Sequence, residues 1–507
     1  MSTSTVRLTT PATLYPYQEN DIIKLLSKLD EGNIPRRLLY QLPTGGGKTV
    51  IFSELAKRFI QKRNLKVMIL THRIELCKQT SKTLMSFGIG NKLISSVSRI
   101  VRKDHHDCYV AMVETLKNRL KDRLIDTKDV GLVIIDEAHH NSFHKLLGQF
   151  ENASVIGVTA TPFSSDINLP MRKNYEELIV GESVVSLIEQ GFLANPKTWK
   201  YDVELNTLQT GFYGDYTVST SDELYSSSPM LELLVHAYTS HAAKKKTLIF
   251  NNGIITSKKV FHTFTELGYP IRHLDNATPT AERREILSWF KKTKGAILTS
   301  VSILTTGFDE PSVQAVILNR ATTSLTLYHQ MIGRGARRLP KKKQFSIIDL
   351  GNNTERFGNW NDPIDWQYVF DHPEEFYERM SSQTTYEAHS ISSELRASFP
   401  NTLELSFDVE KAHHTAIEQH QKPKIVIRDS IRQHALMCVD NSESIVEALA
   451  LAELLDKEIT WRIKQYGKCL GKVTKNYTDW LKEDYRSKLK ILIQKIIARR
   501  AIIKCAV

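Results

Sequence analysis

Short runs of consecutive aliphatic residues recur along the first 350 positions and are separated by longer polar or amphipathic stretches. Continuous runs of this kind predict strands buried on both faces, as in parallel sheets covered by helices. In strands with one face in solvent, apolar and polar residues alternate instead. The pattern therefore predicts an α/β fold with two tandem parallel-sheet lobes. The expected strands are residues 38–40, 67–70, 109–112, 132–135 and 155–158 in the first lobe, and 247–250, 296–299, 315–318 and 345–349 in the second.

The pattern changes after the second lobe, where apolar positions recur at helical spacing. Tyr485, Leu489, Leu492 and Ile496 lie at i, i+4, i+7 and i+11, which is the apolar stripe of a helix packed on one side. We therefore expect the C-terminal part of the chain to be a mostly helical module.

These changes of pattern divide the chain into four parts. We expect a first lobe over residues 1–170, a connector over 171–235, a second lobe over 236–355 and an accessory, helical and basic module over 356–507. The length agrees, since a chain of 507 residues corresponds to roughly three domains. Within the connector, residues 207–228 are rich in Thr, Ser, Gly and Tyr, and they predict an irregular segment.

A glycine-rich turn follows the first expected strand and leads into an apolar helical stretch. It reads LPTGGGKT, with Leu42 at the position where the strict phosphate-loop motif has Gly. Glycines let consecutive backbone N–H groups close around a polyphosphate at a helix N-terminus. Lys48 is placed to reach the β- and γ-phosphates, and the Thr49 hydroxyl is placed to ligate Mg²⁺. The predicted nucleotide-binding residues are Thr44, Gly45, Gly46, Gly47, Lys48 and Thr49.

Two adjacent carboxylates follow the buried run 132–135. The end of a parallel strand is where open α/β sheets bind ligands. Asp136 is suited to hold Mg²⁺, and Glu137 is suited to polarise an attacking water, since phosphoryl transfer mainly requires positioning and charge neutralisation. With Lys48 of the phosphate loop, this pair predicts a catalytic site for nucleoside triphosphate hydrolysis.

The ordered motifs between about residues 15 and 340 resemble those of the superfamily 2 DEAD/DEAH-box ATP-dependent helicases, with Asp-Glu-Ala-His at 136–139. The resemblance implies two RecA-like lobes, ATP and Mg²⁺ as cofactors, and a nucleic-acid substrate. It also implies that Gln18, in an upstream adenine-sensing motif, reads the base edge. Thr159 and Thr161 match the motif that couples hydrolysis to lobe movement.

By the same resemblance, the last two motifs contain the residues that the second lobe contributes to the nucleotide site. Gly307 and Asp309 lie in the motif TTGFD and are expected at the nucleotide, and Gln330 opens the catalytic motif QMIGRGAR. Arg334 and Arg337 follow three residues apart, so a helix projects both from one face. A guanidinium can meet two oxygens of the γ-phosphoryl group, over which the transition state spreads its charge. We expect both arginines to act as arginine fingers when the cleft closes.

The family's strand-contacting motifs match five positions of this chain, which are His72, Arg73, Thr115, Asn251 and Thr299. The first of these motifs has His-Arg where DEAD-box RNA helicases typically have Pro-Thr-Arg, which favours the DNA-repair and restriction branch. We expect an ATP-dependent helicase or translocase that acts on DNA rather than RNA. Three alternatives remain: a restriction or defence motor that translocates duplex DNA without unwinding it, an RNA helicase, and a nucleotide-gated binding protein whose function lies in residues 360–507.

The positive charge is concentrated at the C-terminus. The formal net charge is +12, and residues 461–507 contain 13 Lys or Arg against 3 Asp or Glu, so this tail carries +10. A basic face binds polyanions, with an affinity that falls steeply as salt rises. The tail is therefore either a nucleic-acid track or a helix packed on the protein with its basic side in solvent, and both hypotheses remain open.

Composition places the protein in a reducing compartment. The five cysteines are scattered and form neither a disulfide framework nor a metal knuckle. No apolar run approaches the ~18–20 residues of a membrane span, and the N-terminus shows no secretory signal. We expect a cytoplasmic protein with no membrane partner, and the sequence assigns no protein partner.

Overall fold

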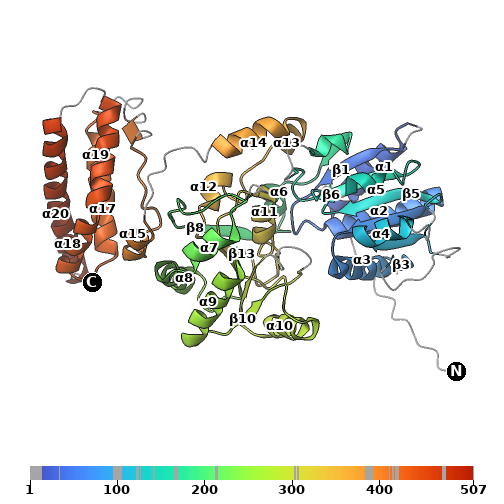
Figure 1. The fold of residues 1–507 in the computed structure, drawn as a ribbon, viewed down its shortest axis with the longest axis horizontal. Helices are drawn as coiled ribbons and strands as arrows, with labels where there is room; N and C mark the ends of the chain where they lie inside the picture. The colour runs from blue at the N-terminus through green and yellow to red at the C-terminus, as the bar shows by residue number, and fades with distance from the viewer. Residues whose placement is uncertain are drawn as a thin grey trace.

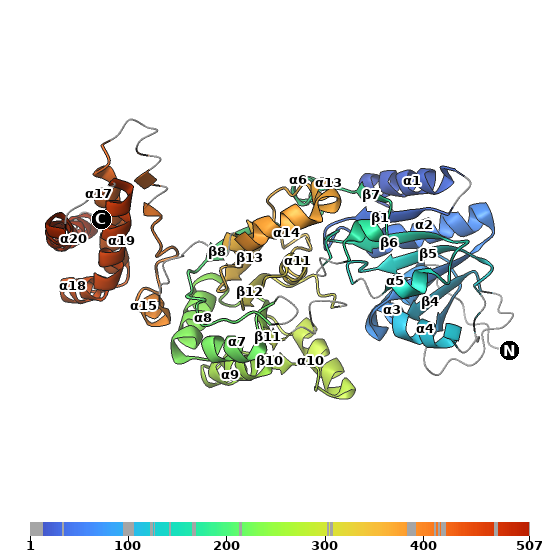
Figure 2. The same cartoon turned by 45° about the horizontal axis from the view of Figure 1, so that its top comes forward.

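The computed structural model describes residues 14–505, apart from residues 33–34, 95–105, 122–124, 126, 141–142, 165–168, 212–214, 302–303, 305–307, 383–391, 410–411, 414–415, 417–421 and 471–474. Figure 1 shows two α/β lobes and a group of C-terminal helices, which follow one another along the longest axis of the molecule. The turned view in Figure 2 keeps the three parts distinct. The expected fold class, two parallel-sheet lobes followed by helices, is confirmed.

The first lobe is built on a seven-stranded sheet with the order β3-β4-β2-β5-β6-β1-β7. Every pairing is parallel, so the carboxyl ends of the strands meet at one edge of the sheet. Its strands are β1 (Arg37–Gln41), β2 (Lys66–Thr71), β3 (Asn91–Ile94), β4 (Cys108–Met112), β5 (Val130–Asp136), β6 (Ser154–Thr159) and β7 (Glu177–Val180). The edge that these carboxyl ends share is where the site lies.

Helices cover both faces of this sheet because successive strand residues point to opposite sides. Leu132 and Ile134 of β5 belong to the same apolar cluster as the helices α1, α2 and α3, whereas Val133 and Ile135 belong to the cluster of α4 and α5. The helices are α1 (Pro16–Asp30), α2 (Lys48–Arg63), α3 (Ile74–Ser86), α4 (Val113–Lys121) and α5 (His144–Leu147). The continuous apolar run thus reflects burial on both sides.

The second lobe repeats this plan with six parallel strands in the order β10-β11-β9-β12-β13-β8. Its strands are β8 (Asn195–Lys200), β9 (Thr247–Asn251), β10 (Ile271–Leu274), β11 (Ile297–Ser300), β12 (Ala315–Asn319) and β13 (Gln344–Asp349). Ile249 and Ile317 pack with α7 (Val218–Tyr225), α8 (Ser228–His241) and α9 (Ile254–Glu266). Leu248 and Phe250 pack with α10 (Thr280–Lys292) and α11 (Leu325–Gly333) on the other face.

Residues 171–235, the expected connector, contribute an edge strand to each sheet, β7 and β8, and the short helix α6 (Val184–Glu189). The irregular segment expected over 207–228 was wrong for its second half, which contains α7 and the start of α8. The reason is tertiary: the Asp222 carboxylate accepts hydrogen bonds from the Thr256 N–H and hydroxyl, and Tyr225 is buried on the sheet. These contacts outweigh the weak helix propensity of Thr and Ser.

The C-terminal module has an apolar core of its own. Short helices lead to it, which are α12 (Asn353–Phe357), α13 (Trp366–Asp371), α14 (Pro373–Ser382) and α15 (Ser393–Ser398). Its main helices are α17 (Ile425–Asp440), α18 (Ile445–Leu454), α19 (Asp456–Leu470) and α20 (Lys475–Cys505). Tyr485 and Leu489 of the predicted stripe are buried, and Leu492 and Ile496 are partly buried in the same core. Within the described parts of the chain, no helix is both long enough and apolar enough to cross a bilayer.

A buried ion pair lies at the centre of this module. Arg462 is completely buried, and its Nε donates to Glu458 Oε1 at 2.7 Å. Its other nitrogens donate to Ser430 Oγ, Gln433 Oε1 and the carbonyl of Leu405. A buried guanidinium is tolerated only with a counter-charge and satisfied donors, so this network fixes how the helices pack.

Removing the counter-charge should therefore destabilise the module. We expect Glu458→Ala to lower the opening free energy of α17 by about 3–5 kcal/mol, the usual cost of stranding a buried charge. Native-state hydrogen exchange of the α17 amides measures this directly. Glu453→Ala is the matched control, because Glu453 is an exposed partner of Lys490 and should change little. Equal protection in both variants would contradict the prediction.

Candidate active site

Three adjacent strands carry the predicted catalytic segments to one edge of the first sheet. β5, β6 and β1 are neighbours, and their register pairs Asp136 with Val158 and Gln41 with Thr159. The turns that follow these strands therefore lie side by side. They contain the Asp136–Glu137 pair, the Thr159–Thr161 segment and the phosphate loop, which the sequence predicted separately.

The phosphate loop has backbone geometry that requires glycine. Gly45 and Gly47 have φ values of +92° and +87°, in the left-handed region that side chains disfavour. A Cβ on Gly46 would lie 2.8 Å from Leu42 Cγ, and one on Gly47 would lie 2.5 Å from Gln18 Nε2. Gly47 is also the N-cap of α2, so the loop presents a helix N-terminus, the usual cradle for phosphate.

Tyr17 and Gln18 of α1 hold this loop from one side. The Tyr17 hydroxyl donates to the Gly46 carbonyl at 2.7 Å, and Gln18 Nε2 donates to the Tyr17 hydroxyl at 3.3 Å. Gln18 Oε1 accepts from the backbone N–H of Tyr15. Gln18 thus lies against the phosphate loop with one side of its amide fixed. Reading of the base edge by Gln18 stays a prediction.

Lys48 lies among the carboxylates that the sequence assigned to catalysis. Burial lowers the pKa of Lys48, and the charges of Glu137 and Asp136 oppose that shift. Burial and the neighbouring Glu137 charge raise the pKa of Asp136. Burial also disfavours the charged form of Glu137, but the positive charges of Lys48 and Arg334 outweigh it and lower the Glu137 pKa. Glu137 is therefore the carboxylate kept ionised, as a group that polarises water must be.

The backbone of Glu137 is in the left-handed region, with φ at +53°, which is uncommon for a residue with a side chain. Two contacts hold this turn: Glu137 N–H donates to Asp136 Oδ1 at 3.0 Å, and Ala138 N–H donates to the Val158 carbonyl at 3.0 Å. The strain is thus maintained by the neighbouring strand β6, and it sets the direction of the Glu137 side chain.

His139 joins the two lobes through both nitrogens of its ring. Burial lowers its pKa to about 4, so the ring is neutral near pH 7. Its Nδ1 lies 3.0 Å from Thr159 Oγ1, whose own proton goes to the Thr161 carbonyl, so Nδ1 carries the donated hydrogen. Its Nε2 then accepts from Gln330 Nε2 at 3.2 Å. Gln330 and Thr159 are therefore linked through one neutral imidazole.

Further contacts bring α11 of the second lobe against the first. The Thr161 hydroxyl donates to Thr326 Oγ1 at 2.8 Å. A Cβ on Gly333 would lie 2.5 Å from Thr44 Cβ, so only glycine allows α11 to approach the phosphate loop this closely. Thr326 is a contact that the sequence did not reveal, since nothing distinguishes it from other polar helix residues. The predicted coupling segment is thus in contact with both lobes.

The two arginines do not share one helical face, which corrects that expectation. α11 ends at Gly333, Arg334 is its C-cap, and Arg337 pairs with Leu193 in an isolated antiparallel bridge. Arg334 donates to the Phe308 carbonyl at 2.7 Å and lies within electrostatic range of Glu137, and burial lowers its pKa. Arg337 forms an ion pair with Asp309. Gly307, the other predicted residue of that motif, lies outside the described residues.

These residues fit a nucleoside triphosphate with Mg²⁺. The glycine cradle cannot accept a Cβ, and Lys48 and Arg334 bring positive charge where a polyphosphate needs it. Thr49 in the first turn of α2 and Asp136 at the end of β5 supply the oxygen ligands that Mg²⁺ prefers.

Three predicted strand contacts lie in the first lobe and are only partly accessible. His72 and Arg73 follow β2 and are half-buried, and Thr115 is half-buried in the first turn of α4. The His72 ring packs between His140 and Phe143, with centroids 4.6 and 4.4 Å away. Contact of these three residues with nucleic acid stays a prediction.

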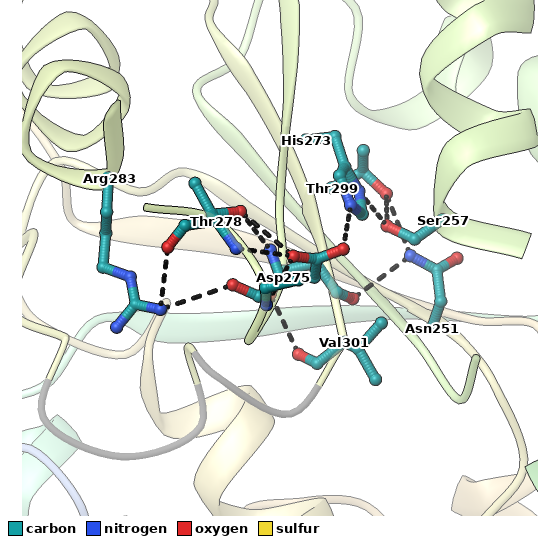
Figure 3. A network of polar contacts seen from close by, with 10 residues as sticks. Asn251, Ser257, His273, Asp275, Thr278, Arg283, Thr299 and Val301 are labelled. Atoms are coloured by element: carbon teal, nitrogen blue, oxygen red, sulfur yellow. Dashed lines mark hydrogen bonds and ion pairs between the residues drawn. The ribbon is translucent and has the colours of Figure 1, made fainter. Parts of the chain in front are cut away.

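Asn251 and Thr299, the predicted contacts of the second lobe, are completely buried. Asn251 Nδ2 donates to Thr299 Oγ1 at 2.9 Å (Figure 3) and to the Ser300 carbonyl. Its Oδ1 accepts from Asn319 Nδ2. Neither side chain can touch a strand in this conformation. Asn and Thr suit a buried hydrogen-bond network at the ends of strands as well as they suit a phosphate contact, and the sequence alone does not distinguish the two.

The same network contains Ser257, His273 and Asp275 in a row (Figure 3). Ser257 Oγ lies 2.9 Å from His273 Nδ1, and His273 Nε2 lies 3.0 Å from Asp275 Oδ2. Ser257 is completely buried and its hydroxyl also contacts Thr299, so no substrate can reach it as a nucleophile. The row is therefore structural, and it holds the loop at Asp275.

That loop accepts hydrogen bonds from Arg283 of α10, which also contacts the first lobe. Arg283 Nη2 donates weakly to the carbonyls of Asp275 and Thr278 (Figure 3). Its Nη1 lies 3.9 Å from Glu75 Oε1 of α3. Sequence reasoning missed this inter-lobe ion pair, because Arg283 stands among other charged residues of an amphipathic helix. The cleft thus has a charged contact as well as the hydrogen bonds of α11.

Several cations of the basic tail are paired with carboxylates of its own module. Five cations of α20 form ion pairs, namely Lys482 and Arg486 with Asp456, Lys488 with Asp484, Lys490 with Glu453 and Arg500 with Asp440. Lys495 and Arg499 are exposed, and no carboxylate of the described residues lies within ion-pair distance of either. The net charge of the tail therefore overstates the charge that α20 offers to a polyanion.

Comparison with known proteins gives matches in both lobes. Residues 12–164 match the family model for the type III restriction enzyme, res subunit, and residues 229–338 match the model for the helicase conserved C-terminal domain. The chain is 29% identical over 364 residues to a putative ATP-dependent helicase, IRC3, of Saccharomyces cerevisiae. That alignment covers 66% of this chain and 51% of the relative, so the chain spans about half of the relative's length.

Two solved structures show the same fold. A fragment of a putative HsdR subunit of a type I restriction enzyme from Vibrio vulnificus YJ016 is similar with a TM-score of 0.54 and 24% identity, over 68% of this chain and 65% of that one. The ATP-dependent Type ISP restriction-modification enzyme LlaBIII, bound to DNA, is similar with a TM-score of 0.51 and 16% identity, over 95% of this chain and 40% of that one. With the motifs meeting at one cleft, the two family models show that the chain contains both lobes of a superfamily 2 helicase, the first matching a restriction-enzyme family and the second the helicase C-terminal domain.

Proposed function

We propose that this chain is an ATP-dependent motor that couples hydrolysis at the inter-lobe cleft to movement along, or separation of, nucleic-acid strands. The observation that carries the proposal is the completion of one site by two lobes. Gln330 and Arg334 of the second lobe lie with His139 and Glu137 of the first, and Gly333 lies against Thr44. A site built in this way links the nucleotide state to the opening and closing of the cleft.

DNA is the proposed substrate in preference to RNA. The res-subunit family model matches residues 12–164 of the first lobe, which contain the His72-Arg73 sequence that favoured the restriction branch. The LlaBIII structure, similar in fold over nearly the entire chain, is a DNA complex. ATPase stimulation by single-stranded DNA, duplex DNA and RNA, compared at one salt concentration, tests this choice, and preferential stimulation by RNA would overturn it.

Mg²⁺ is the proposed metal, with Thr49 and Asp136 as its protein ligands. Bound there, it would neutralise the charge of the β- and γ-phosphates. The residues of this chain supply the remaining parts: the N-terminus of α2 orients the phosphates, Lys48 meets their charge, and ionised Glu137 can accept a proton from water.

Two substitutions in the first lobe should separate nucleotide binding from hydrolysis. We expect Lys48→Ala to abolish ATP turnover, because it removes the charge that meets the phosphates. Glu137→Gln should bind ATP but fail to hydrolyse it, because the amide keeps the shape of the side chain and cannot accept a proton. Fluorescent-nucleotide binding and phosphate release measure the two steps. Lys62→Ala, an exposed lysine of the same helix, is the control, and a parental rate in Glu137→Gln would refute the assignment.

The second lobe should contribute through its arginines. We expect Arg334→Ala and Arg337→Ala each to lower turnover by about 10³–10⁵, the usual worth of an arginine finger, with little change in nucleotide affinity. Arg337 must leave Asp309 to reach a nucleotide, so its effect tests whether that exchange occurs. Arg338→Ala is the matched control, because Arg338 is exposed and adjacent. Parental turnover in both variants would show that neither arginine acts at the γ-phosphate.

The tail can be tested at its exposed cations. If α20 is a nucleic-acid track, Lys495→Glu with Arg499→Glu should weaken DNA binding and reduce the slope of log K against log salt by roughly 0.7–0.9 for each phosphate that is no longer neutralised. Charge reversal of Lys482 and Arg486 is the informative comparison, because both side chains already pair with Asp456. This reversal should mainly lower the melting temperature of the protein. An unchanged slope in the folded Lys495/Arg499 variant would leave α20 as a structural helix.

A further inference from the structure

We propose that His72 is a positioning residue that transmits nucleic-acid binding to Glu137 through a row of aromatic rings in contact, and is not itself a contact to the strand. The idea rests on the proposed function, because it concerns how nucleic acid stimulates hydrolysis at the same cleft. It changes the role of one residue that the motif resemblance assigned to the strand backbone.

The position of His72 follows from the sheet. It is the first residue after β2, and β2 pairs in parallel with β5 so that Leu70 lies beside Ile135. The turn after β2 therefore lies next to the turn after β5, which contains Glu137. The Thr71 hydroxyl donates to the Arg73 carbonyl at 3.1 Å and keeps the β2 turn tight. A displacement of the turn after β2 therefore displaces the turn after β5.

The contact between the two turns is made by aromatic rings. The His72 ring packs edge-on against Phe143 and His140, with ring centroids 4.4 and 4.6 Å apart. The His140 ring centroid in turn lies 4.3 Å from that of His139. Phe143 is buried and fixes one end of this row. The other end is the ring that hydrogen-bonds Thr159 and Gln330 and has its Nδ1 3.6 Å from Glu137 Oε2.

The polarity of His72 does not suit a phosphate contact. Its Nε2 is buried and makes no hydrogen bond within the described structure. Burial lowers its pKa to about 3, so the ring is neutral near pH 7 and offers no charge to a backbone phosphate. Arg73 beside it has the charge and is half-buried at the cleft side of the same turn. Arg73 is thus suited to contact the nucleic-acid backbone. His72 is suited to transmit the displacement of this turn to His140 and His139.

Glu137 is a responsive end point for such a displacement. Its φ of +53° lies in a small region that a side-chain-bearing residue occupies only when its surroundings hold it there. A shift of the His140 and His139 rings changes those surroundings and therefore the direction of the carboxylate. The same shift acts on Gln330 through its bond to His139, so cleft contact and carboxylate orientation change together.

A metal site is the competing use of three neighbouring histidines. Among the described residues, no group of three His, Cys, Asp or Glu side chains is arranged to hold a metal ion. Both ring nitrogens of His139 are already engaged by Thr159 and Gln330. The His72 ring packs edge-on against its neighbours and the His140 and His139 rings are tilted, as in ordinary aromatic contacts, which favours a mechanical role.

The test compares three substitutions in the full chain. His72→Phe keeps the ring and removes its nitrogens, whereas His72→Gln keeps a polar group and removes the ring, and His72→Ala removes both. Two quantities are measured: the Kd for a labelled single-stranded oligodeoxynucleotide, and the ratio of DNA-stimulated to basal ATP turnover. Thermal melting confirms that each variant is folded.

We expect His72→Gln and His72→Ala to bind the oligonucleotide with nearly parental Kd and to lose stimulation about fivefold to tenfold. His72→Phe should retain most of the stimulation, because the ring contacts survive. Arg73→Ala should instead weaken the Kd. His262→Ala, an exposed histidine of α9, is the control and should change neither quantity.

Two results would overturn the proposal. A weaker Kd in His72→Phe, equal to that in His72→Ala, would mean that the ring nitrogen touches the strand. Parental stimulation in the folded His72→Gln and His72→Ala proteins would mean that the rings transmit nothing. If no nucleic acid stimulates the parental protein, the proposed function itself fails, which is a separate and recognisable outcome.

Discussion

The parallel register of β5, β6 and β1 is the constraint on which the rest of the site depends. It places Asp136 beside Val158 and Gln41 beside Thr159, so the three turns that follow reach one edge at the same level. A shift by one residue would turn every side chain of the strand to the opposite face, and would move the carboxylates out of line with the neighbouring turns. The continuous aliphatic runs stabilise this register, because each strand is packed on both faces.

The second lobe contacts this edge of the first sheet through hydrogen bonds between neutral groups more than through ion pairs. His139 can accept from Gln330 and donate to Thr159 only while its ring is uncharged, and burial keeps it so. The buried charges nearby are balanced among themselves, with Lys48 and Arg334 facing Asp136 and Glu137. Burying these charges costs desolvation free energy. Such a cost is typical of catalytic sites, which need an ionised carboxylate away from bulk water.

The C-terminal module follows a different principle. Its helices are fixed by an apolar core and by the buried Arg462–Glu458 pair, while surface cations pair with surface carboxylates. Total charge is therefore a weak guide to binding here, because most cations of α20 already have a partner within the module. A polyanion-binding surface on the described part of α20 would reduce to Lys495 and Arg499, the exposed cations that no carboxylate pairs.

The sequence by itself determined the two lobes, the order of the motifs and the residues of the phosphate loop, because burial on both faces and the need for glycine are local and leave a direct pattern. It did not determine the end of α11 at Gly333, the helix α7, or the burial of Asn251 and Thr299. Those depend on contacts between segments far apart in the chain: Gly333 with Thr44, Asp222 with Thr256, and Asn251 with Asn319. Local residue types suit several such partners equally well, and only tertiary packing selects one.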